Sequence, residues 1–137
     1  MDPANQAGIW GIRASVYAEY GYEGVKKSIE FASKAIELDN KNAFWYFYKG
    51  VYLGRLRRME KGPVVPKEEE VQCLEEAMKK HKDPAFYAFT AEVYVDTWKA
   101  IEKLRKRNKL TMADAKTRET ISQQLEQLKS IAAKYFK

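Results

Sequence analysis

The side chains that most often carry catalysis are scarce in this chain, which has a single histidine, His81, and a single cysteine, Cys73. A Ser/His/Asp relay needs a histidine beside a nucleophile, and a structural zinc site needs about four Cys, His or acidic ligands. His81 and Cys73 fall on the same predicted helix, so neither kind of cluster can be assembled from the usual parts. We therefore expect no enzyme activity, no catalytic residue, no metal site and no cofactor.

Each of these residues has a simpler structural explanation. His81 lies in the segment KKHKD beside a predicted helix end, where the negative end of the helix dipole favours a solvated imidazole. Cys73 lies on an amphipathic helix and fits a small buried side chain. The acidic run 68–70 is better explained as a helix start than as a catalytic carboxylate pair, because acidic side chains stabilise helix N-termini. Phosphate-binding, zinc-protease and calcium-loop motifs do not occur in the sequence.

Two basic clusters could contact phosphate groups. RLRRMEK covers residues 55–61 and KLRKRNK covers residues 103–109, each near the end of a predicted helix. Stacked hairpins would bring both clusters to one edge, which could then follow a nucleic-acid backbone. Alternatively, lysine and arginine simply favour the negative C-terminal ends of helices, and both interpretations stay open. This basic edge consists of Arg55, Arg57, Arg58, Lys103, Arg105, Lys106, Arg107 and Lys109.

The composition predicts one folded helical domain over residues 1–137, with 45% hydrophobic and 32% charged residues but only four prolines and seven glycines. No stretch approaches the roughly 18 apolar residues of a membrane span, so we expect no membrane partner. The N-terminus lacks a secretory signal and the lone cysteine excludes an internal disulfide, which favours a cytoplasmic protein, with the nucleus not excluded. The chain is equally compatible with a piece of a longer array.

Hydrophobic periodicity and capping residues predict about six helices. We expect them over residues 8–20, 24–38 and 43–59, from Pro66 onward, over 84–107, and after Thr111. Asn42, Asp83 and Thr111 are the expected N-caps, whereas GYEG (21–24) and KGPVVP (61–66) are the expected breaks. The five consecutive aromatic residues 44–48 point in all directions around their helix, which favours packing on several sides in a stack.

The pattern of large and small residues resembles the tetratricopeptide repeat, a helical hairpin of about 34 residues. The first helix of such a repeat has an aromatic, then a small residue four positions later, then a large residue three further on. The three units that fit are Trp10/Ala14/Tyr17, Tyr46/Gly50/Leu53 and Tyr87/Ala91/Tyr94, and Ala35 and Ala77 match the small residue of the second helices. The resemblance implies an all-α fold of three stacked antiparallel hairpins, an α-solenoid, over about 8–39, 43–82 and 84–136. A plain three-hairpin bundle is the structural alternative.

The resemblance also implies a partner-binding groove lined by the first helix of each hairpin. The implied groove residues are Phe44, Phe47, Val51, Arg58, Ala88, Glu92 and Lys99. A mostly small and apolar groove with a basic rim suits a peptide or a partner helix, so we expect a protein-binding scaffold module. Members of the family that bind chaperone tails use lysine and asparagine where this chain has Gly11, Ser15 and Tyr48, so we do not expect that ligand.

Two further partners follow from the sequence. The run Ala35–Asp39 is similar to the interferon-induced tetratricopeptide-repeat proteins, which implies RNA binding through the basic edge, although the run recurs across the superfamily. Terminal helices of a repeat stack also expose apolar flanks unless polar residues cap them. Trp10, Tyr135 and Phe136 are the candidates for such flanks, and they predict a homodimer formed through the terminal hairpins.

Overall fold

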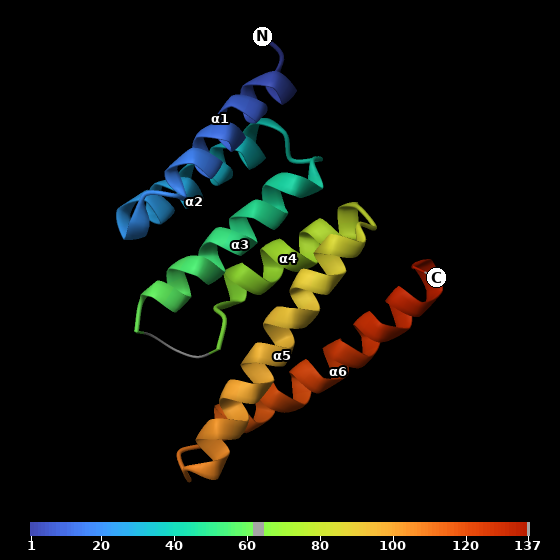
Figure 1. Ribbon diagram of the computed structural model, residues 1–137. Coiled ribbons are helices and arrows are strands. Elements are labelled where there is room, and N and C mark those ends of the chain that lie inside the picture. The colour runs from blue at the N-terminus through green and yellow to red at the C-terminus, as the bar shows by residue number, and fades with distance from the viewer. Residues whose placement is uncertain (62–64, 137) are drawn as a thin grey trace. The chain divides into compact units, whose positions relative to one another are not determined.

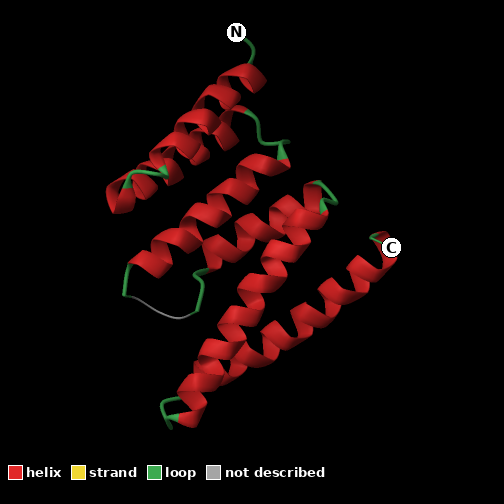
Figure 2. Ribbon diagram, in the orientation of Figure 1, coloured by secondary structure: helices red, strands yellow, loops and turns green. Residues whose placement is uncertain are grey.

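The computed structural model describes residues 1–61 and 65–136, and within these residues it contains helices and no strand (Figure 2). The six helices are α1 (Pro3–Tyr17), α2 (Gly21–Leu38), α3 (Ala43–Met59), α4 (Glu68–Lys80), α5 (Pro84–Lys106) and α6 (Met112–Tyr135). The prediction of an all-α fold built from helical hairpins is therefore confirmed. Residues 62–64 of the predicted KGPVVP loop lie outside the described residues.

The chain falls into two compact units. The N-terminal unit, Met1–His81, contains α1 to α4, and the C-terminal unit, Lys82–Lys137, contains α5 and α6. In the N-terminal unit α1 packs on α2, α2 on α3 and α3 on α4, so its two hairpins are stacked through the α2–α3 contact (Figure 1). The C-terminal unit is a single hairpin in which α5 packs on α6.

The first helix begins earlier than predicted, at Pro3 rather than near Gly8. Asp2 caps it, because its carboxylate accepts a hydrogen bond of 2.8 Å from the backbone N–H of Asn5. Proline suits the first helical position because the N–H that it lacks would have no partner there. The same Asp-Pro pair correctly marks the start of α5 at Pro84, so residues 2–3 carried a signal that the sequence analysis missed.

The predicted break at GYEG is also wrong, because α2 already begins at Gly21. The interruption instead covers Ala18 to Tyr20, and the chain turns into α2 through the positive φ of 73° at Gly21. Gly24 then serves packing, since a Cβ atom on it would collide with the carbonyl oxygen of Tyr17. Glycine at position 24 therefore lets two helices approach closely and does not end one.

The bounds of the later helices agree more closely with those predicted from the sequence. Helix α3 has the predicted bounds, and the side chain of Asn42 accepts a 3.0 Å hydrogen bond from the N–H of Phe44. Asp83 and Thr111 cap α5 and α6 in the same way. Helix α4 starts at Glu68 instead of Pro66, with Lys67 as its N-cap residue.

Small residues form the centre of the N-terminal unit. The buried side of α1 consists of Ala7, Gly11 and Ala14, Ala18 is buried just beyond the end of that helix, and α2 adds Ala32 and Ala35. Buried Ser28 on α2 donates its hydroxyl to the carbonyl oxygen of Ala14 at 2.7 Å, so this polar group has a partner across the helix pair. Because the side chains are so small, the helix backbones can lie close together.

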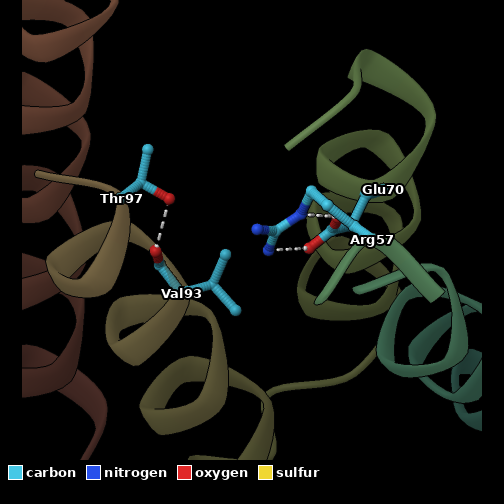
Figure 3. Close-up of polar contacts among 4 residues, drawn as sticks. All are labelled: Arg57, Glu70, Val93 and Thr97. Atoms are coloured by element: carbon cyan, nitrogen blue, oxygen red, sulfur yellow. Dashed lines mark hydrogen bonds and ion pairs between the residues drawn. The ribbon is translucent and has the colours of Figure 1, made fainter. Parts of the chain in front are cut away.

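The core of the C-terminal unit follows one side of α5. Its buried residues Phe86, Thr90, Val93, Thr97 and Ile101 recur every three or four positions, as one helix face requires. The two buried threonine hydroxyls donate to the carbonyl oxygens one turn earlier, as Figure 3 shows for Thr97 and Val93 at 2.8 Å. Ala91, which the repeat pattern equates with buried Ala14 and Gly50, is only half-buried.

Candidate functional site

Cys73 and His81, the two residues most often used in catalysis, both make packing contacts within the helices. Cys73 is buried, and this burial raises the pKa of its thiol to about 11, so it stays protonated and a poor nucleophile near neutral pH. His81 is exposed at the C-terminal end of α4, where its backbone N–H donates a hydrogen bond to the carbonyl oxygen of Ala77 at 3.1 Å. Its imidazole packs on Phe44 of α3, with 6.2 Å between the ring centroids.

Two carboxylates of the acidic run at the start of α4 are paired with cations of α3. Figure 3 shows Arg57 and Glu70 in a two-point contact, with Nε to Oε1 at 2.8 Å and Nη2 to Oε2 at 3.1 Å. Glu70 is only 2% exposed, and Lys49 pairs with neighbouring Glu69 at 2.9 Å. These ion pairs join α3 to α4, which gives the carboxylates a structural role in the second hairpin.

A small hollow of about 150 Å³ lies beside this ion pair, lined by Leu53 and Leu56 of α3 and by the start of α4. Ligand pockets usually measure about 300–1,000 Å³, so this hollow is too small for a drug-sized ligand or a peptide. Among the described residues, no three His, Cys, Asp or Glu side chains gather in a way that could hold a metal ion. A larger but more open hollow of about 510 Å³ is lined by Tyr46 and Lys49 of α3 and by residues of α4, including Gln72 and Lys79. A binding site is therefore better sought on the open surface of the helices.

The predicted groove residues of α3 share one side of that helix, since positions 44, 47, 51 and 58 are three, four and seven residues apart. Phe44 and Arg58 are exposed, whereas Phe47 and Val51 are half-buried. Val51 also packs against the core cluster that contains Ala14 and Tyr52. Phe44 and Arg58 are therefore the more exposed members of this side.

Four rings form a continuous row on this part of the N-terminal unit, and we call His81, Phe44, Tyr48 and Tyr52 the aromatic row. Successive ring centroids are 6.2, 6.2 and 6.4 Å apart. Phe44 is 40% and Tyr48 39% exposed, whereas Tyr52 is 6% exposed, and its burial raises the pKa of its hydroxyl. The row thus presents three exposed rings and ends at a buried fourth.

Sequence reasoning missed the aromatic row as a unit, although it singled out Phe44. Phe44, Tyr48 and Tyr52 recur every four residues, which is the spacing of neighbours on a helix. That part of the row was readable in the sequence. The position of His81 in the row could not be predicted from the sequence, because it depends on how α4 packs along α3.

The predicted groove residues of α5 also share a helix face. Ala88, Glu92 and Lys99 are four and seven residues apart, and all three are exposed. They belong to the C-terminal unit, whereas Phe44 and its neighbours belong to the N-terminal unit. That both sets line one groove stays a prediction.

The first basic cluster is largely occupied by contacts within its own unit. Arg55 donates a 3.3 Å hydrogen bond to the carbonyl oxygen of Ala18 and lies 5.9 Å from the ring centre of Tyr52. Arg57 is held by Glu70, and its side chain is 16% exposed. Arg58 is the exposed arginine of the three. Phosphate binding at 55–58 would therefore have to compete with packing contacts.

The second basic cluster is exposed around the turn between α5 and α6. Asn108 has a positive φ of 56°, and the N–H of Lys109 bonds to the carbonyl oxygen of Leu104 at 2.9 Å, which is a Schellman ending. The exposed cations at this end of the helix are Lys103, Arg105, Lys106, Arg107 and Lys109. Arg105 also donates to Glu102, and this hydrogen bond lowers the pKa of the carboxyl.

We call residues 99–118, around the turn between α5 and α6, the basic tip. The net positive charge of the whole chain is concentrated in this segment. It contains eight Lys and Arg against two Asp and Glu, a net charge of +6, which equals that of the complete chain. The N-terminal unit has thirteen cationic and twelve anionic residues, a net charge of +1. The two units therefore differ strongly in their attraction for polyanions.

The candidates for exposed apolar flanks are partly covered. Trp10 packs on Phe31 at 5.5 Å between ring centroids, and Phe136 packs edge-on against Tyr87 at 5.3 Å. The side chain of Tyr135 lies outside the described residues. Instead, α1 exposes an apolar stripe that consists of Ile9, Ile12, Val16 and, just beyond the helix end, Tyr20.

No helix among the described residues combines the length and the apolar character needed to cross a bilayer. Comparison of the chain with protein-family models, with curated proteins and with solved structures finds no match. We therefore infer function from the geometry and the charge of the two units.

Proposed function

We propose that this chain is a non-catalytic binding module that holds a segment of a partner protein against the aromatic row of its N-terminal unit. The observation that carries this proposal is the exposure of Phe44 and Tyr48 at 40% and 39% on one side of α3. Aromatic side chains are enriched at the centres of protein interfaces, because they bury a large area at a small cost in side-chain entropy.

The scaffold beneath the row supports this role. Helix α3 is packed on two sides, by α2 and by α4, and the Arg57–Glu70 contact ties it to α4. Rings on a rigid helix lose little freedom on binding, which favours affinity. The stacked hairpins and their small buried residues also support the proposed relationship to tetratricopeptide repeats, whose first helices bind partners.

A selection from random displayed peptides tests the proposal. We expect selected peptides to bind the wild-type chain and to lose at least about tenfold in affinity on Phe44→Ala or Tyr48→Ala, as truncation of an aromatic hot spot predicts. Tyr20→Ala removes an exposed tyrosine on the first hairpin and should leave affinity unchanged. Peptides that bind both row variants as tightly as the wild type would place the binding surface elsewhere.

A second candidate function is attachment to a nucleic-acid backbone through the basic tip. The favouring observation is that residues 99–118 carry a net charge equal to that of the whole chain. Neutralised phosphates release counterions, so affinity for single-stranded RNA should fall steeply as salt rises from 50 to 200 mM. The prediction that the two basic clusters form one edge is not needed for this function.

Charge reversal tests the basic tip directly. Lys103→Glu, Lys106→Glu and Arg107→Glu together should abolish RNA binding at low salt, measured by anisotropy of a labelled oligonucleotide. The matched control reverses three exposed lysines of the N-terminal unit, Lys27, Lys41 and Lys79. Equal loss in both variants would indicate a response to net charge alone and would exclude a site at the tip.

A further inference from the structure

The basic tip joins α5 to α6 and carries positive charge that the C-terminal unit does not compensate (Figure 1). Of its two acidic residues, Glu102 is already paired with Arg105 at 3.0 Å and with Arg118 of α6. The other, Asp114, is half-buried. Within the part of the chain that the structure describes, six exposed cations of the tip form no ion pair, namely Lys99, Lys103, Lys106, Arg107, Lys109 and Lys116.

An apolar side chain lies at the turn among these cations. Met112, the first residue of α6, is 90% exposed, which is the highest value among the exposed large apolar residues of the described chain. Lys109 precedes it by three positions, and Lys116 follows it by four, which makes Lys116 its neighbour on the helix surface. In water this apolar surface gains nothing, whereas beside an apolar phase it would be removed from water.

Hydrogen bonds hold the backbone on both sides of Met112. Before it, the N–H of Lys109 donates to the carbonyl oxygen of Leu104 at 2.9 Å. After it, the N–H of Asp114 donates to the hydroxyl oxygen of Thr111 at 3.0 Å. The turn is therefore ordered before any ligand arrives, so binding costs little conformational entropy.

We propose that the basic tip docks on an anionic membrane surface, with Met112 inserted among the lipid headgroups and the six unpaired cations above negatively charged lipids. A bilayer presents both chemistries that the tip can meet, anionic headgroups at the surface and an apolar layer just beneath them. Docking at the surface needs no spanning segment, so the sequence-based expectation of no membrane partner, which considered only such segments, does not exclude it. The tip shares no residue with the aromatic row, and this inference is independent of the proposed peptide-binding function.

A nucleic acid, the second candidate ligand of the basic tip, accounts for the cations but not for the other features. Residues 99–118 contain no Phe, Tyr or Trp. Proteins that bind single strands combine cations with aromatic side chains on which the bases stack. A phosphate backbone is charged along its whole length and offers no apolar layer for Met112. The tip therefore fits an anionic lipid surface better than a nucleic acid.

Co-sedimentation of the full chain with lipid vesicles tests the proposal. The probe is vesicles of phosphatidylcholine with about one third phosphatidylserine, and we expect binding to these but not to phosphatidylcholine alone. Each Lys or Arg near an anionic surface raises affinity roughly fivefold, so reversal of Lys103, Lys106 and Arg107 to Glu should weaken binding at least about a hundredfold. The matched control reverses three exposed lysines of the N-terminal unit and should retain binding, whereas equal loss would overturn a site at the tip: Lys27, Lys41 and Lys79.

Met112→Gln separates docking from attraction by charge alone, because it changes no charge. It should weaken vesicle binding by about threefold to tenfold, since the apolar contact with lipid is lost. Met59→Gln makes the same change at a methionine of the N-terminal unit that is 45% exposed, and it should leave binding unchanged. Unchanged circular dichroism and melting curves for both variants exclude unfolding as the cause.

A fluorophore at position 112 reports insertion directly. Met112→Cys can be labelled selectively with a polarity-sensitive dye, because Cys73 is buried. We expect the emission of the labelled protein to shift to the blue on addition of phosphatidylserine vesicles and to stay unchanged with phosphatidylcholine vesicles or oligo-uridine.

The outcomes distinguish the membrane from its competitors. If oligo-uridine or a DNA duplex binds at the tip and phosphatidylserine vesicles do not, the ligand is a nucleic acid and the membrane is ruled out. If vesicles bind Met112→Gln as tightly as the wild type and the dye at position 112 shows no blue shift, attraction by charge alone replaces the docking surface. Either result leaves the peptide-binding function standing, because that function is tested at Phe44 and Tyr48 of the other unit.

Discussion

The indole ring of Trp45, on α3, lies directly against Gly11 of α1, where a Cβ atom would overlap the ring. This contact links the first helices of the two stacked hairpins. It also explains why α1 carries a glycine in the middle of its buried side, where a glycine costs helix stability. The ring fills the space that any larger residue at position 11 would occupy.

We predict that Gly11→Ala destabilises the protein by about 1–3 kcal/mol, because the added methyl group must displace a large ring in a packed site. Gly8→Ala, one turn earlier on the same helix, is the matched control, since a Cβ atom there meets nothing within 4 Å. Alanine at position 8 should stabilise by about 0.5–1 kcal/mol through helix propensity. Urea unfolding of both variants measures the difference, and equal stabilities would contradict the packing argument.

The Arg57–Glu70 contact predicts strong coupling between two side chains. Arg57→Ala should cost about 3–5 kcal/mol, because it leaves the carboxylate of Glu70 buried without its counter-ion. Arg58→Ala removes an exposed neighbour and should cost less than about 0.5 kcal/mol. The double variant Arg57→Met/Glu70→Leu should recover most of the loss, because it removes both charges together. The single variants Arg57→Met and Glu70→Leu complete a double-mutant cycle, and a double variant whose loss equals the sum of these two single losses would show that the pair is not coupled.

Cys73 should react slowly in the folded protein. Burial raises the pKa of its thiol to about 11, above the usual value of about 8.5, so little thiolate forms at pH 8. Because the folded pKa is the higher one, the stabilisation that Cys73 contributes is present below the unfolded pKa and is lost as pH rises through the folded one. Labelling with a chromogenic disulfide at pH 8 should be slow in buffer and rapid in denaturant. Rapid labelling of the native chain would mean that the thiol is accessible.

Local signals predicted most of the fold because capping and periodicity act over a few residues. Asn42, Asp83 and Thr111 each cap a helix as predicted. Gly24 was misinterpreted because glycine marks both turns and close helix contacts. Only the position of the Tyr17 carbonyl in space distinguishes the two.

The candidate site was less predictable because it depends on contacts between helices. Arg57 and Arg58 are adjacent in sequence and were grouped in one basic edge, but Arg57 is ion-paired with buried Glu70 whereas Arg58 is exposed. The His81–Phe44 contact likewise joins residues from two helices. The net charge of the basic tip could be predicted without a structure, because the excess of Lys and Arg over Asp and Glu can be counted along the sequence.

The apolar stripe of α1 bears on the predicted homodimer. Ile12 is 65% and Val16 48% exposed, and exposed apolar patches of this kind favour association. Ile12→Glu should therefore shift sedimentation toward the monomer at high protein concentration without lowering the melting temperature. Ser122→Glu, on the exposed polar side of α6, is the control. A wild-type chain that stays monomeric at all concentrations would contradict association through α1.

The turn that gathers the basic tip depends on Asn108, which adopts the left-handed conformation with φ 56°. Asparagine tolerates this conformation better than other residues with a side chain, but glycine has no steric penalty there at all. Asn108→Gly should therefore keep the turn and its Lys109–Leu104 hydrogen bond, with stability unchanged or higher by up to about 1 kcal/mol. Asn108→Val should cost about 1–2 kcal/mol, because a β-branched residue strains the same backbone. Thermal unfolding compares the two variants, and a valine variant as stable as the glycine variant would show that the left-handed turn does not hold the end of α5.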